Sequence, residues 1–152
     1  MRKRGFTLIE LLLYMALITI IMSALMPFAW NLLQNGDKSK TQENLSATGR
    51  FIAEKIKYEV RNASTVTSVT STTLTLPTST FNLTGGNLQL NGVNLNPSNT
   101  SVTNLTFTNN SSLDLKSKNV GFVFTVNANY GSARQEYQGS LNFRGAAEVR
   151  SN

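Results

Sequence analysis

The sequence predicts an α+β protein in which one long N-terminal helix packs on an antiparallel β-sheet. Three observations predict this class. Residues 11–36 carry no charge and are mostly apolar, residues 37–61 place charges around an apolar helical stripe, and residues 62–113 are again uncharged but alternate apolar with polar residues. We therefore expect four segments, which are a basic start (1–5), a membrane-spanning helical half (6–33), an amphipathic helical half (34–61) and a β-rich head (62–152).

Composition argues against several classes of function. The 152 residues include no cysteine and no histidine, and only 14% of them are charged. Thiolate nucleophiles, imidazole bases, disulfides and zinc sites with nitrogen or sulfur ligands are therefore excluded. We expect no enzymatic activity, no cofactor and no metal site.

The apolar run is long enough to cross a membrane. About 20 apolar residues span a bilayer as a helix, and this run is apolar on all sides. Arg2, Lys3 and Arg4 precede it and predict a cytoplasmic N-terminus, and Trp30 lies near its far end, where an indole ring prefers the interface. A cleaved secretory signal peptide is the alternative, but its apolar core is typically only ~7–15 residues long.

Glu10 is a charged residue near the start of this apolar segment. An ionised carboxylate within a membrane costs on the order of 3 kcal/mol. Glu10 could stay hydrated at the cytoplasmic interface near Arg4. Alternatively, a cut after Gly5 would give Phe6 a free amine one helical turn from Glu10, and such an amine would be a suitable partner for a buried carboxylate.

Residues 4–12, Arg-Gly-Phe-Thr-Leu-Ile-Glu-Leu-Leu, resemble the class III signal of type IV pilins and type II secretion pseudopilins. The resemblance implies that residues 1–5 are a leader and that the scissile bond follows Gly5. It implies that Phe6 becomes the N-methylated N-terminus, and that Glu10 recruits the subunit and neutralises the Phe6 amine of a neighbour. Pro27 stands where many pilins bend their helix. Loss of three basic residues would leave 11 basic against 8 acidic residues, or about +3 instead of +6.

The same resemblance implies a pilin fold and a structural function. The chain would be a subunit of a type IV pilus or a type II secretion pseudopilus, processed by prepilin peptidase. Its implied partners are other pilin subunits, an inner-membrane assembly platform and, before assembly, the lipid bilayer. It would begin as a single-pass inner-membrane protein and end in a periplasmic or cell-surface filament.

The second helical half is predicted to be amphipathic. Leu45, Ile52, Ile56 and Val60 lie close to one stripe, and Glu54 with Lys57 could form an ion pair on the exposed face. Gly36 is the expected weak point between the halves. Together with Pro27 it predicts one or two bends, or local melting, rather than a straight rod.

The head is predicted to consist of short strands. Gly85-Gly86 and Asn91-Gly92 are hairpin signals, and Asn96-Pro97-Ser98 indicates a loop. A central strand is expected at 120–126, and the 102–108 and 137–143 segments are expected beside it in one antiparallel sheet. Further apolar pairs predict shorter strands around 66–69, 74–76, 81–83 and 88–90.

The head also resembles the J-type minor pseudopilins and related minor pilins in its order of elements. The similar segments are 56–63, 102–107 and 139–150. This implies a minor subunit with a priming or tip position. Two alternatives remain, a Cys-free major pilin and a membrane-anchored adhesin or DNA-uptake module. DNA binding would use scattered basic residues and two tyrosines, namely Lys116, Lys118, Arg134, Arg144, Arg150, Tyr130 and Tyr137.

Overall fold

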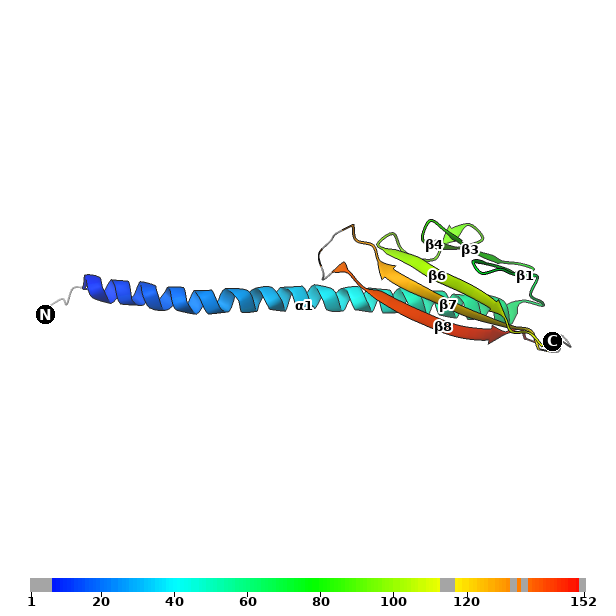
Figure 1. The fold of residues 1–152 in the computed structure, drawn as a ribbon, viewed down its shortest axis with the longest axis horizontal. Helices are drawn as coiled ribbons and strands as arrows, with labels where there is room; N and C mark the ends of the chain where they lie inside the picture. Colours follow the sequence, from blue (N-terminus) through cyan, green and yellow to red (C-terminus); the bar gives the residue numbers. More distant parts are fainter. Residues whose placement is uncertain (1–6, 113–116, 132–133, 135–136, 151–152) are drawn as a thin grey trace. The chain divides into compact units, whose positions relative to one another are not determined.

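The first element is a single long helix. The computed structural model describes residues 7–112, 117–131, 134 and 137–150, without the side chains of 33–35. Helix α1 (Leu8–Asn62) runs for 55 residues and confirms the predicted helix (Figure 1). The chain divides into two compact units between Asp37 and Lys38, so that α1 contributes residues to both.

In the second unit, α1 packs on β-structure through one stripe. The four predicted residues of this stripe are each at most 1% exposed. Gly49 is a buried member of the stripe that the apolar pattern did not reveal. A Cβ at Gly49 would collide with the ring of Phe143, so the absence of a side chain lets the sheet approach the helix there.

A small five-stranded antiparallel sheet follows the helix. Its strands are paired in sequence order, as in a meander. Gly85 and Gly86 turn one hairpin, and Asn91 and Gly92 turn the next, all with positive φ, which confirms both predicted turns. The strands are β1 (Ser68–Val69), β2 (Thr73–Thr75), β3 (Thr80–Thr84), β4 (Asn87–Leu90) and β5 (Val93–Asn94).

Three longer strands form a second antiparallel sheet alongside the C-terminal part of α1 (Figure 1). They are β6 (Thr100–Asn109), β7 (Asn119–Ala128) and β8 (Ser140–Glu148), with β7 in the centre as predicted. The rings of Phe122, Phe124 and Phe143 stack in succession, with centroids 6.1 and 5.4 Å apart. The inward-facing residues of this sheet, the helical stripe and the buried residues of the meander together form the core.

The predicted sheet of the 102–108, 120–126 and 137–143 segments is confirmed as β6, β7 and β8, and the shorter strands form a sheet of their own. One detail of the predicted head is wrong. The last strand was expected from Tyr137, but β8 begins at Ser140 and continues to Glu148. Tyr137 instead pairs with Tyr130, with ring centroids 5.5 Å apart, before the strand starts.

The meander is attached to the edge of the second sheet. The N–H of Val102 donates to the carbonyl of Gly86 (2.8 Å), and the N–H of Phe107 donates to that of Ser71 (3.0 Å). The predicted loop at Asn96 is confirmed, and the Asn96 amide is buried within it. Its Oδ1 accepts from the N–H of Leu88 (2.9 Å), and its Nδ2 donates to the carbonyl of Thr100 (2.9 Å).

Candidate functional site

Thr7 begins the helix on which the candidate site is built. Its carbonyl accepts from the N–H groups of Glu10 (3.1 Å) and Leu11 (3.2 Å), and its Oγ1 lies 3.4 Å from the Glu10 nitrogen. Thr-x-x-Glu is the sequence of a capping box, and here the threonine serves as the N-cap. The helix therefore starts at Leu8, so that Glu10 lies in its first turn.

Glu10 is on the surface of the first turn. Its carboxylate has no hydrogen bond or ion pair within the described part of the chain. Gly5 and Phe6, the predicted cleavage and methylation residues, lie outside the described residues. A carboxylate in the first turn is favoured by the positive end of the helix dipole, whatever further partner it meets.

Beyond Glu10 the first unit presents apolar side chains on every side. All residues from Leu8 to Leu32 are exposed, and Ile21, the least exposed of the large apolar ones, still keeps 46% of its surface. A soluble monomer rarely exposes an apolar patch above a few hundred Å². This surface therefore needs lipid or another protein around it.

Two hydroxyl groups in this segment are satisfied within the helix. Thr19 Oγ1 donates to the carbonyls of Ala16 (2.8 Å) and Met15 (3.0 Å), and Ser23 Oγ donates to that of Ile20 (2.8 Å). Such bonds remove the cost of placing an unpaired hydroxyl in hydrocarbon. By length and composition, α1 can cross a membrane.

The helix is uninterrupted at Pro27 and at Gly36. Bends or local melting were expected at these positions, and the unbroken helix excludes only the melting. Proline removes one donor, but opening a turn in an apolar environment would leave further backbone groups unpaired. A glycine costs only ~1 kcal/mol, less than nucleating a new helix. Bends at Pro27 and Gly36 stay a prediction.

The N-terminal segment also matches a family model. Residues 1–26 match the prokaryotic N-terminal methylation motif. The match covers the N-terminal segment alone, and it supports the resemblance of that segment to type IV pilins and pseudopilins. Neither a curated protein nor a solved structure gives a significant match to the chain.

The matched motif has three broad implications for this chain. It implies processing by prepilin peptidase and assembly with other pilin subunits. Together with the apolar helix it fits a protein anchored in the inner membrane. Its family is structural rather than enzymatic, and the described residues contain no group of three or more acidic side chains that could hold a metal ion.

The basic residues suggested for DNA binding lie in different places along the described head. Arg134 stacks over Tyr137 at 5.6 Å in the β7–β8 connection. Lys118 donates to Thr65 Oγ1 (3.2 Å) just before β7, and Arg150 donates its N–H to the carbonyl of Arg61 (3.3 Å). Arg144 projects from the middle of β8, and Lys116 falls outside the described residues. Of these residues, Lys118 and Arg150 lie at the same end of the sheet, since the N–H of Val149 donates to the carbonyl of Lys118 (2.9 Å).

Sequence reasoning missed the roles of Thr7, Thr19 and Ser23. The spacing of Thr7 and Glu10 was a usable signal, because a threonine three residues before a glutamate marks a helix start. Interpreting this segment only as a cleavage and assembly signal overlooks the capping role of Thr7. The two hydroxyl residues gave no signal beyond their position in an apolar run.

Proposed function

We propose that this chain is a minor subunit of a type IV pilus or a type II secretion pseudopilus, positioned where filaments are primed or at their tip. The observation that carries the proposal is the coincidence of the methylation motif with a helix on which every described side chain from Leu8 to Leu32 is exposed. A protein that is held in lipid and then transferred into a helical bundle needs such a surface.

In this proposal the segments have separate tasks. Residues 1–5 are the leader, and cleavage after Gly5 exposes Phe6, whose amine is methylated. Residues 6–33 hold the protein in the bilayer with the N-terminus in the cytoplasm. The assembly platform then draws it into the filament, where Glu10 neutralises the amine of a neighbouring Phe6. Residues 34–61 continue the same helix and join it to the head at 62–152, and Pro27 and Gly36 supply bends.

Processing can be tested by mass spectrometry of the intact protein from membranes and from filaments. We expect a chain that begins at Phe6 and carries a methyl group on its amine. Recovery of the chain with Met1 still attached, from filaments as well as from membranes, would contradict the proposed processing.

Assembly can be tested with Glu10→Ala. We expect this variant to be processed normally and to accumulate in the membrane but not in sheared filaments, because the neighbouring amine would be left without its counter-charge. Glu10→Asp is the matched control and should retain part of the incorporation. Wild-type incorporation of Glu10→Ala would remove Glu10 from the mechanism.

The minor role is supported by the absence of cysteine, since the chain cannot form the C-terminal disulfide loop of many major pilins. The minor role can be tested by measuring how many copies of this chain a filament contains. Quantitative mass spectrometry of purified filaments should find this chain far below the most abundant pilin. A chain that makes up most of the filament mass would be the major subunit instead.

A further inference from the structure

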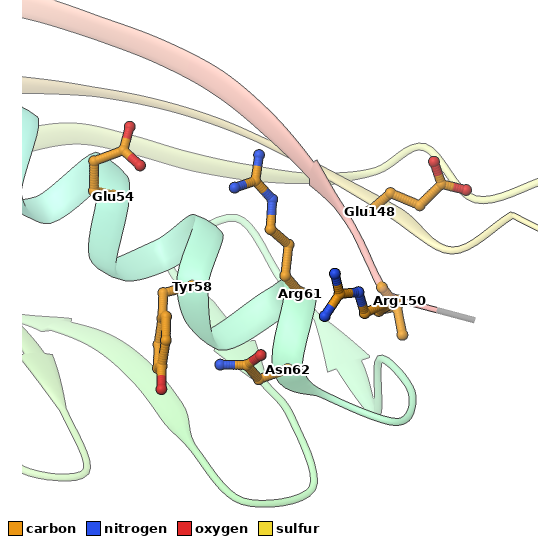
Figure 2. Close-up of a pocket in the computed structure, with 7 residues that line it drawn as sticks. Glu54, Tyr58, Arg61, Asn62, Glu148 and Arg150 are labelled. Carbon is orange, nitrogen blue, oxygen red and sulfur yellow. The ribbon is translucent and has the colours of Figure 1, made fainter. Parts of the chain in front are cut away.

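A groove of about 780 Å³ lies between the last turns of α1 and the end of β8 (Figure 2). The helix contributes Glu54, Tyr58 and Arg61, and the C-terminal segment contributes Glu148 and Arg150. The two sides are joined by the N–H of Arg150, which donates to the carbonyl of Arg61 at 3.3 Å. All these residues belong to the second compact unit, so its packing determines the shape of the groove.

In the groove, the two carboxylates already have partners, whereas the two guanidinium groups do not form ion pairs within the described part of the chain. Glu54 already forms an ion pair of 2.8 Å with a lysine of the same helix. Glu148 accepts a hydrogen bond of 2.6 Å from a serine hydroxyl, and Figure 2 shows its side chain pointing away from Arg150. The guanidinium groups of Arg61 and Arg150 are exposed and make no ion pair or hydrogen bond to another described residue. Arg150 extends toward the end of α1 (Figure 2), so the groove offers cationic groups from both of its sides.

One exposed aromatic side chain lines the groove with these cations, and a second lies farther back along the helix. Tyr58 lines the groove and is 60% exposed, and Phe51 is 54% exposed. They are seven residues apart and therefore lie on the same helical face, two turns from each other. Tyrosine, phenylalanine and arginine are enriched in protein interfaces, and tyrosine and arginine dominate their binding energy.

We propose that this groove docks a neighbouring pilin subunit in the filament, which presents a carboxylate to Arg61 and Arg150 and an apolar side chain to Tyr58. This inference rests on the proposed function. Assembly with other pilin subunits involves the helix that begins at the methylation motif, and the groove is built on the last turns of that same helix. A protein carboxylate fits better than a nucleic acid, because residues 62–152 hold five basic and three acidic residues, a net charge of only +2.

The test uses the full-length chain in cells that assemble the filament. A photo-crosslinking phenylalanine analogue replaces Asn62, an exposed residue that lines the groove. We expect a crosslink to another pilin-like subunit, with the attachment peptide containing an aspartate or glutamate. The same analogue at Val93, which is 68% exposed in the meander, is the control and should not give that product.

Charge reversal then tests the arginines. The double variant Arg61→Glu, Arg150→Glu should lower the crosslinked fraction about tenfold, because it places two negative charges opposite the carboxylate of the partner. Arg144→Glu reverses an exposed arginine on β8 outside the groove and should stay within twofold of wild type. Arg61→Gln with Arg150→Gln serves as a milder pair if charge reversal disturbs folding, and should give an intermediate loss.

The outcomes separate this inference from the proposed function. If wild type enters filaments but the crosslink is unaffected by both pairs of variants, the groove is not the docking site and the filament role stands. A crosslink to nucleic acid or lipid alone also overturns the inference. If wild type never enters filaments, the proposed function fails, and the inference fails with it.

Discussion

The two parts of α1 share one secondary structure but differ in what surrounds them. Between Leu8 and Leu32 no side chain is buried by the rest of the chain. Between Thr41 and Val60, buried positions recur every three or four residues, with exposed or half-buried positions between them. The first pattern fits an apolar environment on all sides, and the second fits water on one side and a protein core on the other.

The length and apolar content of a helix therefore do not determine whether it packs against its own chain or against lipid and other proteins. In the second unit the apolar residues are fewer, but their spacing matches the helical repeat, so each one reaches the core. In the first unit apolar residues occur at nearly every position, so no face is distinguished within one chain. Stability of the first unit must therefore come from lipid or neighbouring subunits, and that of the second from its own packing.

The largest expected contrast comes from the same substitution in each part. Ile52 is 0% exposed and Ile20 is 69% exposed. Ile52→Ala should lower the free energy of unfolding of the head by about 2–5 kcal/mol, because it leaves a cavity in the core. Ile20→Ala should change it by less than ~0.5 kcal/mol. Denaturant unfolding of the full chain in detergent, followed by fluorescence or circular dichroism of the head, measures both.

Equal effects of the two isoleucine variants would contradict the comparison. A large effect at Ile20 would mean that the first part of the helix contributes to the stability of the head. Ile52→Val is the graded control and should cost about 0.5–1.5 kcal/mol, since only one methylene is removed.

A smaller contrast is expected between the two glycines of α1. In an exposed helix, alanine is about 1 kcal/mol more favourable than glycine. A Cβ at Gly36 would meet nothing within 4 Å, so Gly36→Ala should stabilise its turn and slow local amide hydrogen exchange about fivefold. At Gly49 the new methyl would meet the Phe143 ring, so Gly49→Ala should lower the free energy of unfolding by about 1–3 kcal/mol.

The cost of Gly49→Ala in unfolding free energy depends on whether the Phe143 ring can move. Its ring is stacked on Phe124 at 5.4 Å, which restricts its escape from the new methyl group. Phe143→Leu would leave more room, so Gly49→Ala should cost less in that background. If Gly49→Ala stabilises the wild-type protein, the close approach of helix and sheet is not required.

The elements that depend on local pattern could be predicted from the sequence. The stripe of Leu45, Ile52, Ile56 and Val60 follows from the 3.6-residue repeat, and it is buried as expected. The glycine hairpins follow from their need for positive φ, and the expected pair of Glu54 and Lys57 is present at 2.8 Å. The helix start depends on an equally local signal, the threonine three residues before Glu10.

Features that depend on distant contacts could not be predicted. The period of two is the same in both sheets, so it does not show that the meander and the β6–β8 sheet are separate. Tyr137 is a good strand residue by type, but its pairing with Tyr130 places it in the connection. The groove could not be predicted because Arg61 and Arg150 are 89 positions apart and meet only through the fold.

The smallest expected effect concerns the charged face, which exists only in the second part of α1. Lys57 donates a hydrogen bond to Glu54 and attracts its charge, and these two effects hold the pKa of Glu54 below its ordinary value of 4.5. A carboxyl with a lowered pKa in the folded state stabilises that state above the pKa of the unfolded chain, and this contribution disappears as the pH falls through the folded value. The free energy of unfolding of wild type should therefore exceed that of Glu54→Gln slightly at pH 6, and the difference should shrink as the pH falls below 4.5 and vanish once the pH is below the lowered pKa of Glu54. Lys57→Met should remove most of the same pH-dependent part, with a remainder from the attraction of Arg61, and the double variant should lose no more than Glu54→Gln alone. A difference that persisted at low pH would mean that Glu54 acts through packing and not through its charge.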